Sequence, residues 1–345
     1  MDLARFRTIT DAYPTLRIAV FGDFCLDRYL EIDPSKPEVS IETGLPVYNV
    51  VNVRAQPGGA GTIVNNLSAL GIKLIYPVGF AGDDGEGMEL WQALEHRTGV
   101  HMNQFVRSAQ RRTFTYCKPL ICGENRSPVE LNRLDFKNWS PTPALLQGLL
   151  LNHLTEVSEK AEGIILLDQV DIPETGAVTQ TILDGIKNLA QKDRQLPILA
   201  DSRRGLRGFP PVMFKMNAVE LSVLTNNDNK LDLEDIKASA AGLADKNARA
   251  VFITLSEKGM VGAAPHGKVE HVPSLPIRGE IDVVGAGDAV SANLVGATAA
   301  GATLREALEI ASAAASVVIH KLGTTGTANV AEIEDTMKVA GLFTQ

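Results

Sequence analysis

Short apolar runs alternate with longer amphipathic stretches along most of this 345-residue chain, and this alternation constrains its fold more than any other feature. The pattern is typical of a mostly parallel sheet with helices on both faces. The expected strands are 17–22, 73–79, 163–167, 197–200, 213–216 and 250–255. The expected helices are 60–71, 83–97, 173–192, 217–224, 233–245 and 288–300. The sequence therefore predicts an α/β chain with three layers, α/β/α.

Two β-rich segments, 28–56 and 107–136, do not fit this alternation. They are far apart in the sequence but could pair in space. We expect them to form a small sheet that covers the site as a lid, although they could instead be edge strands of the main sheet. The core would then comprise residues 1–27, 57–106 and 137–345.

Composition and charge exclude several classes of protein. The formal net charge of −8 argues against nucleic acid or an anionic membrane as a partner. No run of 18 apolar residues is present, and the N-terminal residues contain no apolar segment of signal-peptide length. Three cysteines without CxxC spacing suggest free, buried thiols in a reducing compartment. We expect a cytoplasmic protein.

Common nucleotide and hydrolase motifs are also absent. Gly262–Val269 matches G-x-x-x-x-G-K but has Val where a P-loop needs Ser or Thr, and no helix follows, so we expect a hairpin turn. The first strand ends in GDFCLD, Gly22–Asp27, which is not a dinucleotide fingerprint. The six histidines show no zinc spacing, and no G-x-S-x-G is found.

The segment DVVGAGD, Asp282–Asp288, carries the strongest chemical signal. An apolar strand end is expected to lead into a Gly-Ala-Gly turn and then a helix. Free N–H groups at a helix N-terminus suit a phosphate, and an adjacent carboxylate can accept a proton from an alcohol. The alternative is an ordinary strand-turn-helix corner in which Asp288 caps the helix.

Other polar positions are expected near the same edge of the sheet, where ligands of such sheets bind. Asp168, Asp201 and Asp282 are each placed at the carboxyl end of an expected strand. Asn217 and Glu220 share one face of a helix start, so they could order water around Mg²⁺ or form a capping box.

Glycines mark a further candidate. Gly58 and Gly59 precede a helix whose first turns carry Asn65 and Asn66. Glycines there allow a backbone to approach a ligand closely, or serve a loop that needs positive φ.

Four ordered segments together resemble the ribokinase-like carbohydrate kinases of the PfkB family. DVVGAGD resembles that family's D-x-x-G-A-G-D signature, and GDFCLD with PGGAGTIVNNLSALG resembles its N-terminal glycine-pair signature. NAVE at Asn217–Glu220 is similar to N-x-x-E, and TLSEKG at Thr254–Gly259 to T-L-G-x-x-G. The resemblance covers nearly the whole chain and implies a ribokinase-like fold with a β lid.

The resemblance implies a role for each matching residue. Asp288 would take the proton from the sugar hydroxyl. The anion hole would consist of the N–H groups of Gly285, Ala286 and Gly287. Substrate contacts would come from Asp27, Gly58, Gly59, Asn65 and Arg133. ATP and Mg²⁺ would be held by Asn217, Glu220, Thr254, Ser256, Gly259, Gly323 and Thr324. A potassium ion would lie at Asp282 and the carbonyl of Val284.

Within the family, GDFCLDRY, NRLDF and HKLGTTGTA resemble the D-glycero-β-D-manno-heptose-7-phosphate kinases. The chain departs from that branch at Thr62, at Asp201–Arg203 and at Ser256. The resemblance implies transfer of phosphate from ATP to the anomeric hydroxyl of heptose 7-phosphate. Fructose, ribose or a nucleoside as acceptor, and a non-catalytic sugar- or nucleotide-binding regulator, are the alternatives. The resemblance also implies a homodimer formed through the lid. Cations that could bind a second phosphate are Arg28, Arg112, Lys118 and Arg133.

Overall fold

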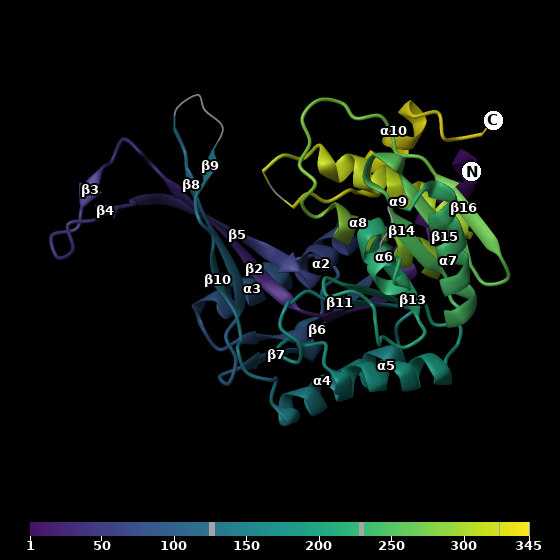
Figure 1. The fold of residues 1–345 in the computed structure, drawn as a ribbon, viewed down its shortest axis with the longest axis horizontal. Coiled ribbons are helices and arrows are strands. Elements are labelled where there is room, and N and C mark those ends of the chain that lie inside the picture. Colours follow the sequence, from purple (N-terminus) through teal and green to yellow (C-terminus); the bar gives the residue numbers. More distant parts are fainter. Residues whose placement is uncertain (124–127, 228–230, 324, 345) are drawn as a thin grey trace.

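The computed structural model describes residues 1–123, 128–227, 231–323 and 325–344. Within these residues the centre of the molecule is a nine-stranded sheet (Figure 1). Its spatial order is β16 (Lys268–Val272), β15 (Met260–Ala264), β14 (Val251–Thr254), β13 (Met213–Asn217), β12 (Ile198–Ser202), β11 (Gly163–Asp168), β1 (Arg17–Gly22), β6 (Leu74–Gly82) and β7 (Phe105–Ser108).

The main sheet is parallel from β14 to β7, as the alternating pattern predicts. Only β15 and β16 run antiparallel, as a hairpin at one edge. The hairpin turn lies inside Gly262–Val269, which confirms that this segment is not a P-loop. The carboxyl ends of β11, β12 and β13 are neighbours, so the polar residues at these ends lie close together.

Helices cover both faces of the sheet, which confirms the three-layer architecture. The helices are α1 (Leu3–Thr10), α2 (Ala60–Ala69), α3 (Gly85–Glu95), α4 (Ala144–Ser158), α5 (Gln180–Lys192), α6 (Ala218–Thr225), α7 (Leu233–Asn247), α8 (Ala286–Ala299), α9 (Leu304–Ile319) and α10 (Val330–Val339). Single 3₁₀ turns occur at η1 (Tyr13–Thr15), η2 (Met102–Gln104) and η3 (Ser256–Lys258).

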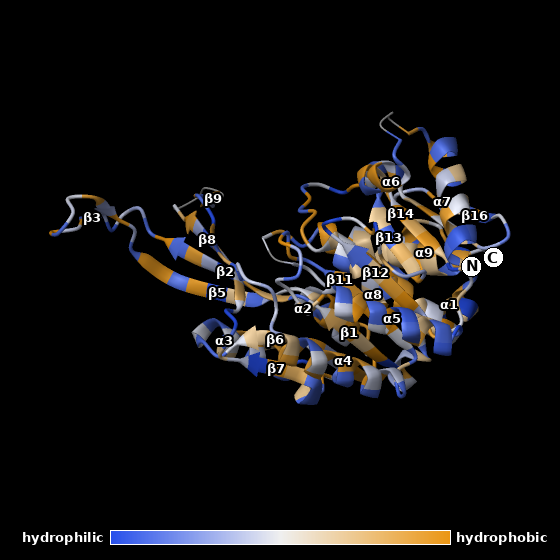
Figure 2. Ribbon diagram, turned by 60° about the horizontal axis from the view of Figure 1, so that its bottom comes forward, coloured by the Kyte–Doolittle hydropathy of each residue, from blue (hydrophilic) through white to orange (hydrophobic). Residues whose placement is uncertain are grey.

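Alternation along β1 explains why the core has two halves. Ile18 and Val20 point to one face, where they pack in a cluster with α1, α2, α8, α9 and α10. Ala19 and Phe21 point to the other, where the cluster includes α4, α5 and α7. Figure 2 shows the apolar residues concentrated along these strands and on the helix faces turned toward them.

A second, smaller sheet projects from the main body, as Figures 1 and 2 show. It contains β2 (Phe24–Ile32), β5 (Val50–Gly59), β8 (Phe114–Ile121), β9 (Val129–Glu130) and β10 (Leu134–Phe136). The short strands β3 (Glu38–Val39) and β4 (Pro46–Val47) pair near its tip. The two β-rich segments therefore pair with each other in space rather than with the main sheet.

The extent of the small sheet differs from the expected lid by a few residues. β2 already pairs with β5 from Phe24, whereas Arg107 and Ser108 belong to β7 and pair with β6 in the main sheet. The reason is that β2 follows β1 after one residue, so the chain passes directly from one sheet to the other.

Two expected elements are wrong. The helix predicted at 173–192 begins at Gln180, because Glu174 adopts a φ of 65° and buried Asp23 accepts the N–H of Ala177 at 2.6 Å. No strand precedes Asp282 either. The segment 273–283 leaves edge strand β16 and returns to the helical layer as irregular chain, so Asp282 is not at a strand end.

The described cysteines are free thiols, as expected, with Cys25 and Cys117 buried and Cys122 partly exposed. None of the helices in the described part of the chain combines the length and apolar character needed to span a membrane.

Candidate active site

The segment Asp282–Asp288 forms a tight turn at the N-terminus of α8. Gly285 occupies the N-cap position with a φ of 82°, a conformation that favours glycine. Asp282 braces the turn, because its carboxylate accepts a hydrogen bond from the N–H of Val284 at 3.0 Å. The N–H of Asp282 in turn donates to the carbonyl of Ile319 at the end of α9, at 2.7 Å.

Asp288 is the third residue of α8 rather than its cap. The alternative in which Asp288 only caps the helix is therefore wrong. Its carboxylate makes no hydrogen bond to the described residues and lines a cavity. Burial raises the pKa of Asp288 to about 7, Lys215 and Arg203 oppose this rise, and the carboxylates of Asp201 and Asp27 add to it. A carboxyl group with a pKa near neutrality is well matched to general-base catalysis.

The amides of the turn are partly available. The N–H of Ala286 donates to the carbonyl of Val283 at 3.2 Å, so one of the three expected anion-hole donors is engaged. The N–H groups of Gly285 and Gly287 form no hydrogen bond within the described residues. The expected anion hole is thus reduced to two free donors, next to the positive end of the α8 dipole.

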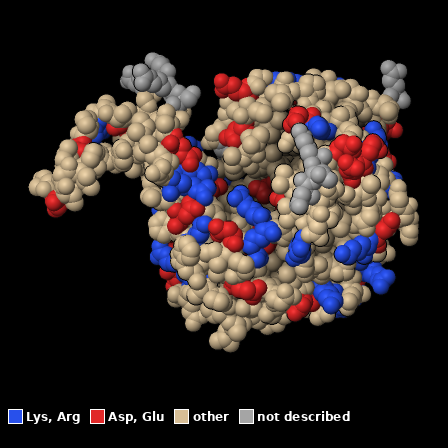
Figure 3. All heavy atoms as spheres, viewed as in Figure 1, with Lys and Arg blue, Asp and Glu red and all other residues tan. Residues whose placement is uncertain are grey.

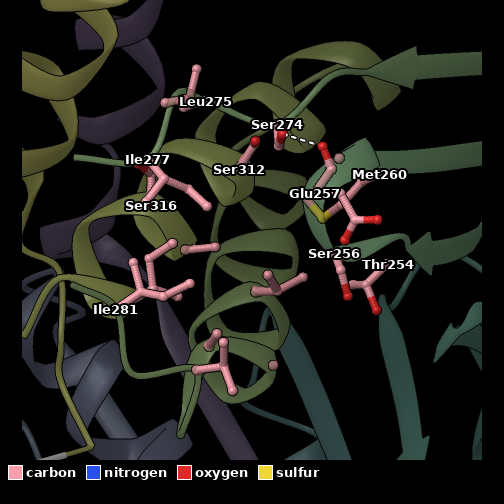
Figure 4. A pocket seen from close by; sticks show the side chains of 17 residues that line it. Thr254, Ser256, Glu257, Met260, Ser274, Leu275, Ile277, Ile281, Ser312 and Ser316 are labelled. Atoms are coloured by element: carbon pink, nitrogen blue, oxygen red, sulfur yellow. Dashed lines mark hydrogen bonds between the residues drawn. The ribbon is translucent and has the colours of Figure 1, made fainter. Parts of the chain in front are cut away.

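A mostly apolar cavity of about 390 Å³ lies on one side of the turn (Figure 4). We call it the apolar cavity. It is lined by Thr254, Ser256, Glu257, Gly259, Met260, Ser274, Leu275, Ile277, Ile281, Val283, Ala286, Gly287, Val290, Ser312, Ala315, Ser316 and Ile319. In Figure 4, Leu275, Ile277 and Ile281 come from the irregular chain before the turn. The hydroxyl of Ser274 bonds to the carbonyl of Glu257 at one side of the cavity. Such a slot with few polar groups suits a flat ring.

A second cavity, of about 260 Å³, lies on the other side of the turn, and we call it the charged cavity. It is lined by Asp27, Gly59, Thr62, Tyr116, Lys118, Arg133, Lys137, Gln169, Asp171, Arg203, Val284, Gly285, Asp288 and Thr325. Figure 3 shows Lys and Arg side chains gathered around a hollow between the small sheet and the main body. The small sheet contributes Asp27, Tyr116 and Lys118, so it forms one wall of this cavity.

The turn separates the two cavities and contributes to both. Ala286 and Gly287 line the apolar cavity, whereas Gly285 and Asp288 line the charged one. A group held by the turn amides would therefore be reachable from both sides.

Asp27 and the glycine pair lie together, as expected. Gly59 lines the charged cavity beside Asp27, whose carboxylate is 3.4 Å from the ammonium of Lys118. A Cβ atom on Gly58 would come within 2.7 Å of Asp27 Oδ2, so glycine at 58 leaves room for that carboxylate. Gly58 itself does not line either cavity.

The expected cations separate into two groups. Lys118 and Arg133 line the charged cavity, and Arg133 is oriented by Asp135, which accepts from Nε at 2.6 Å and from Nη2 at 2.7 Å. Arg28 bonds to Glu86 and Glu89 instead. Arg112 lies near Asp84 and Glu86 of the α3 region. Neither Arg28 nor Arg112 lines the charged cavity.

Asn217 and Glu220 form the capping box of α6. The Asn217 side chain accepts from the N–H of Glu220 at 2.9 Å, and Glu220 Oε2 accepts from the N–H of Asn217 at 2.7 Å. The second carboxylate oxygen, Oε1, has no hydrogen bond among the described residues. Burial raises the pKa of Glu220, and the nearby charge of Asp201 adds to that effect. The cap and a water-mediated magnesium contact are therefore compatible.

The other nucleotide-side residues divide between the cavity and its surroundings. Thr254, Ser256 and Gly259 line the apolar cavity, and Thr254 is the register partner of Asn217. Gly323 does not line it; its carbonyl accepts a hydrogen bond from Arg54 of the small sheet at 3.5 Å. Thr324 lies outside the described residues.

Asn65 also lies apart from both cavities. It is buried on α2, and its Oδ1 has no hydrogen-bond partner among the residues that the structure describes.

Sequence reasoning missed several site residues. Arg203 follows the end of β12, and its guanidinium forms no hydrogen bond or ion pair with the described residues, although it lines the charged cavity. Lys137, which is bonded to Asp171 at 2.8 Å, lines it too. Lys215 lies near the turn beneath α8. A lysine in the apolar run MFKMN is a signal that could have been noticed, because lysine is rarely buried without a partner.

Comparison with known proteins decides the family. The model for the pfkB family carbohydrate kinases matches residues 16–330. The chain belongs to the pfkB family of carbohydrate kinases. It is 28% identical over 342 residues to the "Bifunctional protein HldE" of Hyphomonas neptunium, covering 98% of this chain and 67% of that protein. It is 31% identical over 322 residues to the protein of the same name from Gluconacetobacter diazotrophicus, covering 93% and 63%. The chain thus spans about two thirds of the length of these relatives.

Solved structures of two sugar kinases share the fold. The ribokinase of Arabidopsis thaliana complexed with ribose and ATP aligns with a TM-score of 0.66 at 21% identity, covering 94% of this chain and 99% of that one. Phosphofructokinase-2 of Escherichia coli in complex with potassium aligns with a TM-score of 0.72 at 17% identity, with the same coverage. The ribokinase-like fold expected from the sequence is confirmed.

Proposed function

We propose that this pfkB-family kinase transfers the γ-phosphoryl group of ATP to a hydroxyl group of a sugar phosphate. The observation that carries the proposal is the position of the Gly285–Gly287 turn between the two cavities, with Asp288 on the charged side. ATP would enter through the apolar cavity and the acceptor through the charged one.

The residues on each side have defined tasks in this reaction. Asp288 would accept the hydroxyl proton as the oxygen attacks phosphorus. The free N–H groups of Gly285 and Gly287 would stabilise charge on the transferred group, as preorganised donors do. The apolar cavity fits the base of ATP. Mg²⁺ would supply charge neutralisation on the phosphates when bound.

Glu220 is the residue that best fits a magnesium role. No cluster of three or more His, Cys, Asp or Glu side chains in the described chain could hold a metal ion. Mg²⁺ is usually bound by one or two carboxylates, waters and substrate phosphates, so a cluster of that size is not required. The free Oε1 of Glu220 and the side chain of Asn217 would contact its water shell.

The charged cavity favours an acceptor that already carries a phosphate. Its cations are Lys118, Arg133, Lys137 and Arg203. Within the described part of the chain Arg203 has no acidic partner, and the bidentate contact with Asp135 holds Arg133 in place. Arginine forks match phosphate geometry. Together with the resemblance to heptose-phosphate kinases, this favours heptose 7-phosphate, phosphorylated at its anomeric hydroxyl.

A panel of acceptors tests both parts of the proposal. ATP consumption would be measured with heptose 7-phosphate, fructose 6-phosphate, fructose, ribose and adenosine, each with and without K⁺. The highest kcat/KM is expected for heptose 7-phosphate. Turnover of unphosphorylated sugars alone would contradict a sugar phosphate as the acceptor. No turnover of any acceptor would contradict the kinase function and favour the alternative of a non-catalytic sugar- or nucleotide-binding regulator.

A matched pair of variants tests the acceptor site itself. Arg133→Met is expected to raise KM for a phosphorylated acceptor about tenfold or more, because it removes a charge-assisted hydrogen bond. Arg112→Met, on an exposed arginine outside the cavity, is the control and should leave KM unchanged. Equal KM values for the two variants would contradict the assigned phosphate contact.

Two further features belong to the proposal. A potassium ion at Asp282 and Val284 would stiffen the turn, and K⁺ dependence in the panel tests it. The small sheet and the β3–β4 segment at its tip expose apolar side chains: Val39, Ile41, Leu45, Tyr48, Val50, Val51 and Val53. This apolar surface supports a homodimer formed through the small sheet.

A further inference from the structure

Lys215 is a buried charge in the middle of the molecule. It is on β13, and only 7% of the residue is exposed. Burial acts to lower its pKa, but Asp201, Asp288 and Glu220 outweigh this and raise the pKa. The side chain is therefore an ammonium ion, and an ion in this position must be held by specific partners.

Its contacts connect it to the turn. Nζ of Lys215 bonds to Oδ2 of Asp201 at 2.6 Å. The same oxygen accepts a hydrogen bond from Ser291 on α8 at 3.3 Å, and Ser291 also bonds to the carbonyl of Gly287 at 3.2 Å. A Cβ atom on Gly287 would be 3.0 Å from Nζ of Lys215. The ion pair is thus packed directly against the first turn of α8, beside Asp288.

Asp288 is surrounded by charges from several elements. Those that act on it are Lys215 from β13, Asp201 and Arg203 from β12 and the loop after it, and Asp27 from β2. The other charged side chains that line its cavity are Lys118, Arg133, Lys137 and Asp171. Among the acting charges, Lys215 and Asp201 alone form a direct ion pair, and they act on Asp288 with opposite signs.

We propose that the buried Lys215–Asp201 pair tunes the acidity of Asp288, with Lys215 as a positioning residue that favours the carboxylate and Asp201 as its counterweight. The proposal rests on the kinase function proposed above. Within the pair, the ammonium of Lys215 favours the ionised base near neutral pH, and Lys215 lines neither cavity, so it does this without contacting the acceptor. Without the cation, Asp201 and Asp288 would be two coupled carboxylates, and the second ionisation would occur at higher pH.

The test is the acid limb of the pH profile of kcat/KM. This limb reports ionisation in the free enzyme and substrate. In Lys215→Met the limb should move up by about one pH unit. The activity at pH 6, expressed as a fraction of each protein's own plateau, should then be about tenfold lower in the variant than in the wild type. In Asp201→Asn it should move down, because Lys215 then acts on Asp288 without its counterweight. A phosphorylated acceptor titrates near pH 6 itself, so all variants are compared with the same acceptor.

Controls separate this effect from damage to the fold. Lys215→Arg should restore the limb toward that of the wild type. Lys118→Met, which removes a cation that lines the charged cavity, should raise KM without moving the limb. If Lys215→Met does not fold, Lys215→Gln takes its place, because an amide can still bond to Asp201.

Shifts of opposite sign in the two variants support the inference, and any other pattern overturns it. A wild-type protein without turnover would refute the proposed function instead. Active wild type with unmoved limbs in both variants would refute only the role of the ion pair.

Discussion

Gly285 and Gly301 allow the chemical role of the turn to be separated from backbone strain. Their φ angles are almost equal, at 82° and 79°. Alanine in this left-handed region costs about 1 kcal/mol. For a chain of this size, each substitution should lower the melting temperature by about 2 °C.

The surroundings of the two glycines differ, and this difference sets the expected activities. A Cβ atom on Gly301 would meet nothing within 4 Å, whereas one on Gly285 would lie 3.3 Å from the Cβ of Thr325. Relief of that close contact would move the turn and its free N–H groups. Because misalignment of one such donor costs about 10²-fold in turnover, Gly285→Ala should lose about that factor. Gly301→Ala should keep its activity.

The assay measures kcat with saturating ATP and acceptor, together with thermal unfolding of the same samples. The expected result is two equally destabilised proteins, of which only one is catalytically impaired. Equal activity of the two variants would refute the claim that the amides of this turn act on the transferred group.

Three further perturbations follow from the structure. Asp288→Asn should raise the melting temperature at pH 8 by about 2 °C, the effect of about 1 kcal/mol for a chain of this size. Because the pKa of Asp288 is raised in the folded protein, the stability that this carboxyl group contributes is full below about pH 4 and is lost as pH rises through about 7. The gain should therefore vanish in acid, and a gain that persists there would contradict this assignment. Ile277→Ala should raise KM for ATP several-fold and leave KM for the acceptor unchanged, because Ile277 lines only the apolar cavity; the opposite selectivity in steady-state kinetics would exchange the roles of the cavities. Val51→Asp, at a residue that is 53% exposed on the small sheet, should convert a dimer to a monomer in sedimentation at fixed protein concentration; an unchanged mass would place the dimer contact elsewhere or exclude it.

The main sheet could be predicted from the sequence because its strands are short, apolar and separated by regular helices. The two wrong predictions, the start of the helix at 173–192 and the strand before Asp282, have local causes. Pro173–Thr179 contains Pro173 and Gly176, residue types that favour a loop, and contacts with Asp23 and the left-handed Glu174 hold it out of the helix. The strand expected before Asp282 does not form, and Pro276 and Gly279, residue types that weaken a strand, lie in the segment that leads to it.

Without the family resemblance, the candidate site could be predicted best where the chain places its residues in one segment. Asp282–Asp288 is such a segment, and its turn and helix start lie next to each other in the structure as in the sequence. Arg203 and Lys215 reach the site from neighbouring strands, and only the sheet order brings them together. Asn217 and Glu220 form the capping box that the sequence offered as one of two alternatives. That Glu220 also keeps one carboxylate oxygen without a hydrogen bond in the described residues could not be predicted from the sequence.

The most direct test of the account is a single-turnover measurement of phosphoryl transfer by wild type and Asp288→Asn, with ATP binding measured on the same samples. We expect the variant to bind ATP like the wild type and to transfer the γ-phosphoryl group at least about 10³-fold more slowly, because its amide cannot accept the hydroxyl proton. Transfer by the variant at a rate near that of the wild type would contradict the central claim that Asp288 is the base beside the turn.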